Sequence, residues 1–125
     1  MSLDMYSEII LDHYKNPHNF GKIEDTDAHA IDYNPACGDE VEIFLKINNG
    51  KVSEVRFEGR GCAISQATAS MLTNEIKGKA VNEIAKLDDK FVFELVGVNL
   101  SPVRRNCALL SLKVLKLAAV NYFKE

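Results

Sequence analysis

The 125-residue sequence lacks several features that would assign it to a class at once. It has no run of about 18 apolar residues and no signal-peptide pattern, so a cytoplasmic location with no membrane partner is expected. There is no basic excess, because the net charge is −3, and no nucleic-acid partner is expected. Repeats, low-complexity tracts and linkers are also missing, so we expect a single domain spanning residues 1–125.

Cysteine is scarce, and its spacing suggests no disulfide. Cys37, Cys62 and Cys107 lie 25 and 45 residues apart, without a CxxC motif. An odd number of cysteines in a protein without a secretory signal favours thiols kept for metal or sulfur chemistry. Glycine-rich phosphate loops, Ser/His/Asp series and paired catalytic carboxylates are missing as well, so the sequence does not indicate an independent enzyme.

The pattern of apolar residues predicts an α+β fold. Residues 41–47 and 51–58 alternate between apolar and polar, as antiparallel strands do, and a further short strand is expected near residues 30–31. Helices are predicted for residues 5–14, after Gly61, and for residues 81–87, 91–96 and 108–123. The expected architecture is a small antiparallel sheet of about three strands with helices packed on one face.

Two hairpin registers are conceivable between the central strands. A two-residue Asn49-Gly50 turn would pair Ile43 with Arg56 and mix the apolar and polar faces. A three-residue Asn48-Asn49-Gly50 loop would pair Ile43 with Val55 and keep the faces separate. The sequence therefore favours the three-residue loop.

Three cysteines and one aspartate form a candidate four-ligand metal site. Cys62 and Cys107 each directly precede a predicted helix, and a helix N-terminus stabilises the negative charge of a thiolate. Cys37 and Asp39 stand two apart, so they would share one side of an extended segment and remain partly exposed. The candidate ligands are Cys37, Asp39, Cys62 and Cys107.

The same residues also have interpretations that involve no metal. Buried cysteines often serve only as small hydrophobes, and Asp39 could be a solvated turn carboxylate. The histidines are weaker candidates for ligands: we expect His13 to be structural, and His18 and His29 to be solvated. A redox-sensing interaction module is disfavoured because the cysteines lack CxxC spacing.

The motifs around the candidate ligands resemble those of a known family. They are Asn34-Pro35-Ala36-Cys37-Gly38-Asp39, Gly59-Arg60-Gly61-Cys62-Ala63-Ile64-Ser65 and Pro102-Val103-Arg104-Arg105-Asn106-Cys107. With the segment from Asp12 to Gly21, they are similar to the U-type iron–sulfur cluster assembly scaffolds, which comprise IscU, SufU and the N-terminal domain of NifU. The resemblance covers nearly the whole chain and implies an IscU/SufU-like fold.

The resemblance implies a scaffold rather than an enzyme. Such a protein receives sulfur from a cysteine desulfurase, binds iron, builds a labile [2Fe–2S] cluster and passes it to apo iron–sulfur proteins. An Hsp70-type chaperone and a J-type co-chaperone are further implied partners. By position, Cys37, Cys62 and Cys107 resemble the cluster ligands and sulfur acceptors, and Asp39 resembles the residue that keeps the cluster labile.

The sequence departs from the IscU branch at two places. Asn106 stands where that branch usually has a histidine, which favours Asp39 as the fourth ligand. Leu100-Ser101-Pro102-Val103-Arg104 replaces the Leu-Pro-Pro-Val-Lys motif that chaperones recognise in that branch.

The SufU branch offers an alternative function. It resembles a zinc-dependent sulfur-transfer protein that activates a cysteine desulfurase, with zinc on the same four residues and Cys107 leaving the metal to accept sulfur. SufU proteins carry an insertion between the second and third cysteines, and the 45-residue gap here has no room for it. The scaffold interpretation is therefore preferred.

Overall fold

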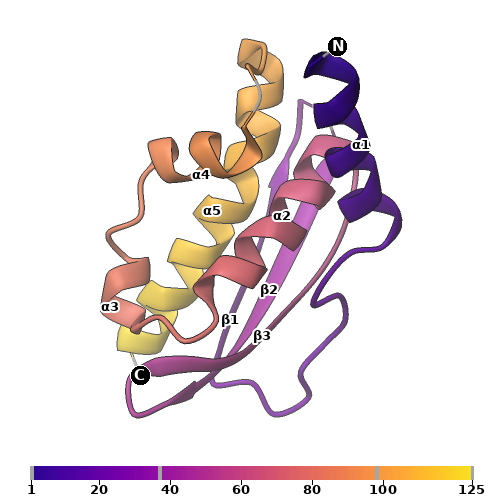
Figure 1. Ribbon diagram of the computed structural model, residues 1–125. Coiled ribbons are helices and arrows are strands. Elements are labelled where there is room, and N and C mark those ends of the chain that lie inside the picture. The colour runs from indigo at the N-terminus through magenta and orange to yellow at the C-terminus, as the bar shows by residue number, and fades with distance from the viewer. Residues whose placement is uncertain (1, 37, 98, 125) are drawn as a thin grey trace.

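The computed structural model describes residues 2–36, 38–97 and 99–124. Three strands form one antiparallel sheet in the order β1-β2-β3, and helices flank it in the sequence (Figure 1). The predicted α+β architecture with three strands is confirmed. The elements are α1 (Ser2–Lys15), β1 (Ala28–Asn34), β2 (Asp39–Asn48), β3 (Lys51–Arg60), α2 (Ala63–Ile76), α3 (Val81–Ile84), α4 (Asp89–Val96) and α5 (Pro102–Lys124).

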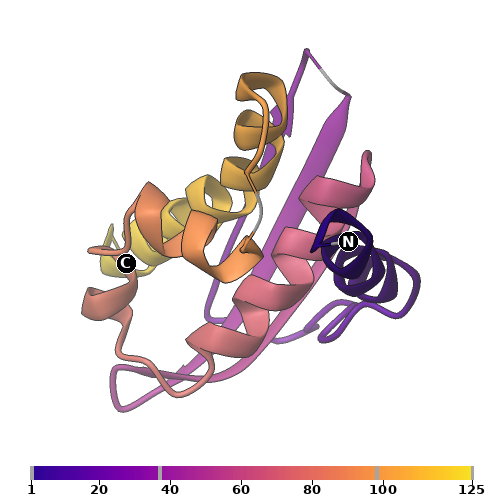
Figure 2. The ribbon, with the colours of Figure 1, turned by 45° about the horizontal axis from the view of Figure 1, so that its top comes forward.

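The helices cover one face of the sheet, as predicted. Both views show α2 and α5 side by side across the sheet, with α1 on the far side of α2 (Figures 1 and 2). Because α2 contacts the sheet, α1 and α5, even its hydroxyl side chains are buried, and Ser70 and Thr73 are fully enclosed. The described helices include none that is long and apolar enough to cross a membrane.

The core lies between the sheet and these helices. Ile43 of β2 pairs with Phe57 of β3, and both side chains are completely buried, as is Leu45. Alternate residues of the same strands point to the outer face, where charged side chains such as Glu54 and Arg56 lie. The alternation in the sequence therefore predicts the inner face correctly for Ile43, Leu45, Val55 and Phe57. Next to the turn the prediction is wrong, because Val52 rather than Ser53 is buried.

The predicted register of the hairpin is wrong. Asn48 pairs with Lys51 across a two-residue turn in which Asn49 (φ 55°) and Gly50 (φ 76°) both have positive φ, the combination that twists with the strands. A bulge near Ser53 then shifts the pairing by one residue, so Ile43 faces Phe57 rather than Val55. The bulge therefore keeps the apolar and polar side chains on opposite faces of the sheet, which the predicted three-residue loop was expected to do.

The last helix begins earlier than predicted, at Pro102 instead of residue 108. Ser101 precedes it, and its side-chain oxygen accepts a hydrogen bond from the Arg104 N–H at 3.4 Å. Serine before a helix and proline at its first position are both favoured. This first turn was not predicted, because the polar side chains of residues 104–106 break the apolar pattern. Since α5 begins at Pro102, Cys107 lies inside the helix rather than before it.

Candidate functional site

Three of the four predicted ligands converge in the structure. One oxygen of Asp39 and the sulfur atoms of Cys62 and Cys107 all lie within 4.8 Å of one another. Asp39 begins β2, Cys62 is the N-cap of α2, and Cys107 lies in the second turn of α5. Cys37, the fourth predicted ligand, falls outside the described residues.

Asp39 is fully buried, which contradicts the expected partial exposure. It lies opposite Asn34 on the face of the sheet that the helices cover. Its Oδ1 accepts a hydrogen bond from the Cys62 backbone N–H at 2.8 Å, and its Oδ2 lies 3.7 Å from Cys62 Sγ. One carboxylate oxygen therefore holds the N-terminus of α2, while the other faces the thiol.

In the part of the chain that the structure describes, the Asp39 carboxylate forms no ion pair with a cationic side chain. Among the described residues, the ion pairs of lysine, arginine and histidine all involve other carboxylates. A buried ionised carboxylate is costly unless an opposite charge or hydrogen bonds compensate it. A bound metal cation at this site would supply the opposite charge that the protein side chains do not.

Gly61 allows this close approach. Its φ is +133°, and a Cβ at this position would overlap the Asp39 side chain. Any other residue would therefore be strained and would also displace the carboxylate. This packing of Gly61 against Asp39 was not predicted from the sequence, although the position of Gly61 directly before Cys62 was the available signal.

Two buried polar side chains support Cys62 from the first turn of α2. The Ser65 hydroxyl donates to the Cys62 carbonyl oxygen at 3.1 Å, and Gln66 Nε2 donates to Ser65 Oγ at 3.1 Å. As the N-cap, Cys62 lies at the positive end of α2, as predicted. Its side chain is half-buried, so it is the more accessible of the two described thiols.

Cys107 has different surroundings. It is 3% exposed and lies within α5, so the predicted stabilisation by a helix N-terminus does not apply to it. Its sulfur still lies near Asp39 and Cys62, because α5 packs across the sheet with the helix face that carries Cys107 turned toward the interior. Convergence with Asp39 and Cys62 therefore depends on helix packing rather than on a loop.

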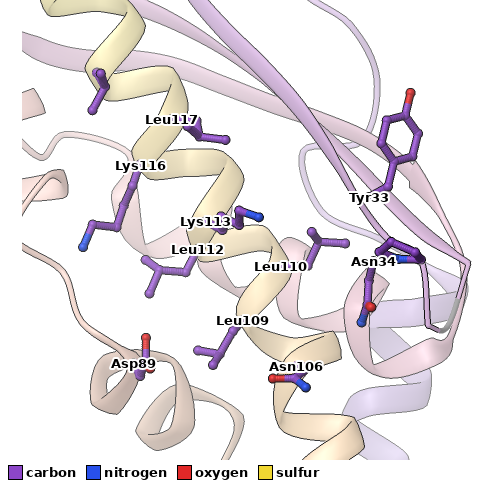
Figure 3. Close-up of a pocket in the computed structure, with 12 residues that line it drawn as sticks. Tyr33, Asn34, Asp89, Asn106, Leu109, Leu110, Leu112, Lys113, Lys116 and Leu117 are labelled. Atoms are coloured by element: carbon purple, nitrogen blue, oxygen red, sulfur yellow. The ribbon is translucent and has the colours of Figure 1, made fainter.

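A groove of about 590 Å³ runs along the outer side of α5 beside this site. Figure 3 shows Tyr33 and Asn34 on one side of α5 and Asp89 on the other. Asn106, which replaces the histidine of the IscU branch, lines this groove. The neighbouring Cys107 is instead directed to the interior.

The histidines lie away from the three converging ligands. His13 Nδ1 is 2.8 Å from Ser70 Oγ, and burial lowers the pKa of His13, with a further lowering from His18. His18 and His29 are exposed, but His18 contacts Asn74 and His29 pairs with Glu42. His13 thus makes a structural contact, as expected, and His18 and His29 are less isolated than expected.

Comparison with known proteins identifies the family to which this chain belongs. A family model described as the NifU-like N-terminal domain matches residues 5–125, and the chain belongs to this family. It is 38% identical over 121 residues to the iron-sulfur cluster assembly scaffold protein IscU 1 of Archaeoglobus fulgidus, covering 97% of this chain and 78% of that protein. It is 36% identical over 129 residues to the zinc-dependent sulfurtransferase SufU of Bacillus subtilis, covering 90% and 87%.

Solved structures show the same fold. The SUF-system scaffold FiSufU of Fervidobacterium islandicum matches with a TM-score of 0.79 and 32% identity, covering 95% of this chain and 99% of that one. A NifU-like N-terminal protein from Brucella abortus matches with a TM-score of 0.78 and 22% identity, covering 98% and 96%. The predicted resemblance to the U-type scaffolds is confirmed.

Proposed function

We propose that this protein is an iron–sulfur cluster assembly scaffold, with residues 1–125 acting as one scaffold domain. It would receive sulfur from a cysteine desulfurase, bind iron, assemble a labile [2Fe–2S] cluster and transfer it to apo-proteins. The observation that carries the proposal is the convergence of Asp39, Cys62 and Cys107 within 4.8 Å. Relatives named as scaffolds, at 38% identity in one case, support it.

The donor set fits iron or zinc. Metal–sulfur bonds of about 2.3 Å in a tetrahedral site place neighbouring ligand atoms about 3.8 Å apart, so only small side-chain movements are needed. Thiolates are the usual ligands of iron–sulfur clusters. We propose Cys37 as the remaining ligand from its place in the Pro-Ala-Cys-Gly-Asp motif.

Asp39 makes the proposed site suitable for temporary binding. A carboxylate oxygen is a harder donor than a thiolate and suits a soft cluster less well. One oxygen of Asp39 is also engaged by the Cys62 N–H, which leaves Oδ2 as the oxygen facing the sulfur. A cluster held partly through this oxygen should form and leave more easily than one held by four thiolates.

Sulfur delivery requires an accessible thiol. Cys62 is half-buried and Cys107 is almost fully buried, so we propose Cys62 as the acceptor among these two. The partners implied are a cysteine desulfurase and apo iron–sulfur proteins. An Hsp70-type chaperone with its J-type co-chaperone belongs to the same proposal, on the strength of the Leu100–Arg104 segment alone.

The alternative is zinc-dependent sulfur transfer. One observation favours it: the 36% identity to the Bacillus subtilis protein named as a zinc-dependent sulfurtransferase. Zinc would occupy the same buried sulfur and carboxylate donors. In that case one thiol leaves the metal to accept sulfur, and the accessibility of Cys62 makes it a better choice than Cys107.

Anaerobic reconstitution distinguishes the two functions. The full chain is incubated with iron, cysteine and a cysteine desulfurase, and then analysed by visible absorption and metal content. The scaffold function predicts sulfur-to-iron charge-transfer bands with about two irons per protein or per dimer. Zinc that resists exchange, together with faster desulfurase turnover and no charge-transfer bands, would establish the alternative instead.

A further inference from the structure

A cavity of about 420 Å³ lies between the end of α1 and the junction of β3 with α2. The end of α1 supplies Lys15 to its walls, and the junction supplies Arg60, Gly61 and Gln66. Because a Cβ on Gly61 would meet the Asp39 side chain, this α1–β3 cavity adjoins the converging metal donors. The proposed function makes no use of the cavity.

The loop after α1 forms a fixed wall of the cavity. Its backbone is attached to the edge of β3, because the Gly21 N–H donates to the Phe57 carbonyl oxygen at 2.8 Å and the Phe57 N–H donates to the Asn19 carbonyl oxygen at 2.9 Å. The Phe20 ring packs edge-on against Phe57, with 5.4 Å between the ring centroids. This half-exposed ring gives the cavity an apolar wall.

The side-chain amide of Gln66 lies at the inner end of the cavity. Gln66 is 6% exposed, and a Cβ on Gly59, which also lines the cavity, would come within 3.0 Å of Gln66 Oε1. The Ser65 hydroxyl donates its proton to the Cys62 carbonyl oxygen, so Ser65 Oγ must accept from Gln66 Nε2. This contact assigns the orientation of the amide and leaves Oε1 as its acceptor atom.

Gln66 Oε1 receives no hydrogen bond from any residue that the structure describes. A buried acceptor without a donor is unfavourable. The described residues contain no fully enclosed polar side-chain atom that lacks a partner, so Oε1 keeps some accessible surface. The α1–β3 cavity is the space that Gln66 lines, and an O–H or N–H group bound there would satisfy this oxygen.

The charged side chains that line the cavity are both positive. Lys15 forms no ion pair within the described ranges, and Arg60 uses one guanidinium nitrogen for Glu40 at 3.3 Å. No carboxylate is among the described lining residues. A carboxylate group of a ligand would therefore find two cations and no like charge on the walls.

We propose that the α1–β3 cavity binds a small hydroxycarboxylate anion. The carboxylate pairs with Lys15 and Arg60, the hydroxyl group donates to Gln66 Oε1, and the carbon skeleton lies against Phe20. An α-amino acid fits less well, because its ammonium group would place a third positive charge beside the two cations. A second carboxylate, as in malate, allows each cation to bind its own carboxylate.

Three acids with the same skeleton test this assignment. Lactate, propionate and alanine carry a hydroxyl group, a hydrogen atom and an ammonium group, respectively, on the carbon beside the carboxylate. Each is titrated into the unmodified full chain at pH 7.5 and constant ionic strength, and ¹⁵N–¹H spectra follow the amides of Gly59, Gly61 and the Gln66 side chain. We expect saturable shifts, with lactate binding about fivefold more tightly than propionate, which corresponds to one hydrogen bond. Alanine should bind most weakly, and malate more tightly than lactate.

The same titrations can overturn the proposal. Shifts that do not saturate, or that sodium chloride reproduces, would mean that the anions only screen the surface charges. Equal affinities for lactate and propionate would exclude the hydrogen bond to Gln66. Because neither iron nor a desulfurase takes part, these results are independent of whether the scaffold function is correct.

Variants assign the two recognition elements. Gln66→Met keeps the length of the side chain but removes the acceptor, so it should bind lactate and propionate with equal affinity. Lys15→Gln should weaken the binding of both acids by the same factor and keep the preference for lactate. Lys90→Gln is the matched control, because it removes an exposed lysine of α4, on the other side of α2 (Figure 1). It should bind as the wild type does, and a Gln66→Met variant that still prefers lactate would contradict the proposal.

Discussion

At the level of single residues, the two oxygens of Asp39 have different surroundings. Oδ1 accepts the Cys62 N–H, whereas Oδ2 faces Cys62 Sγ at 3.7 Å. The side chain is thus both part of the fold and part of the proposed metal site. Substitutions that keep the hydrogen bond but remove the charge can separate these two roles.

Asp39→Ala should therefore affect stability and cluster transfer, whereas Asp39→Asn should affect mainly transfer. Removing the acceptor leaves the Cys62 N–H without its partner, which costs about 1–3 kcal/mol. An asparagine keeps an acceptor oxygen and should largely avoid this loss. We expect both variants to hold a reconstituted cluster longer and to transfer it more slowly, as measured by visible absorption with an apo-ferredoxin acceptor. Unchanged transfer rates in both would contradict the role assigned to Asp39.

Gly61→Ala should impair metal binding through Asp39. An added Cβ overlaps the Asp39 side chain, so the carboxylate must move away from Cys62. Gly21→Ala is the matched control, because Gly21 has the same φ of +133° but a Cβ there would meet only the Arg56 side chain at 3.7 Å. Both variants should lose stability through backbone strain of about 1–3 kcal/mol. Titration with zinc should show weaker binding for Gly61→Ala only.

The sequence identified candidate ligands but could not show that they meet. Helical periodicity after Gly61 correctly placed Cys62 at a helix N-terminus. The separations between the cysteines carry no information about distance in the fold. Their convergence was therefore a hypothesis from the residue types and their local settings, which the resemblance to the U-type scaffolds supported. The burial of Asp39 was missed because it depends on α2 covering the start of β2.

At the level of elements, two side chains of α5 attach this helix to β1. Lys113 Nζ lies 2.8 Å from Asp32 Oδ2, and Asn121 Nδ2 donates to the His29 carbonyl oxygen at 3.0 Å. The hydrogen bond from Lys113 is the main reason that the pKa of Asp32 is lowered from its ordinary 3.8, and the Tyr33 N–H lowers it further. These contacts help to fix the helix that carries Cys107.

Lys113→Met should destabilise the fold modestly at neutral pH. Exposed ion pairs contribute about 0.2–1 kcal/mol, and Lys113 is largely exposed. Because the pKa of Asp32 is lowered in the folded state, its contribution is present above pH 3.8 and is lost as the pH falls through the lower folded pKa. Urea unfolding at pH 7 and at pH 2.5 measures this difference. It should be smaller at the lower pH, and Lys86→Met, which removes another exposed lysine, should show no such dependence.

Elements with strong periodicity were predicted well, and their ends were not. The two strands of the hairpin and the stop of α1 at Asn16-Pro17 follow from local patterns. β1 extends to Asn34 although its last residues are polar, because pairing with β2 satisfies their backbone. The start of α5 was missed because the polar residues 104–106 interrupt the apolar pattern, although serine followed by proline is typical of a helix start.

At the level of the whole molecule, the three described donors come from β2, α2 and α5. The donors of the proposed site meet only when these elements are packed together, so metal binding there would be thermodynamically linked to folding. The folded state gains free energy from a metal that the unfolded chain binds weakly. The linkage can be measured without any partner protein.

Zinc should raise the midpoint of thermal unfolding. At a free zinc concentration 100 times the Kd, the gain is about 2.7 kcal/mol, which for a domain of this size corresponds to roughly 10 °C. The measurement compares scans with zinc and with a chelator. Cys62→Ala should abolish most of the shift. Val52→Ala, a core variant beside the hairpin turn and at the opposite end of β2 from Asp39, should be less stable but keep the shift. Equal shifts in both variants would exclude the proposed site.

The bulge near Ser53 has a consequence for how the hairpin tolerates changes in length. Pairing on the turn side of the bulge follows directly from the Asn49-Gly50 turn, and pairing beyond it is offset by one residue. Deleting Ser53 would close the ladder into a regular hairpin while leaving Phe57 opposite Ile43 and Arg60 opposite Glu40. A one-residue deletion in β2 would instead reverse the face of the sheet to which the side chains between the deletion and Asp39 point. We therefore expect that this hairpin can be shortened by one residue at Ser53 without disturbing the proposed metal ligands.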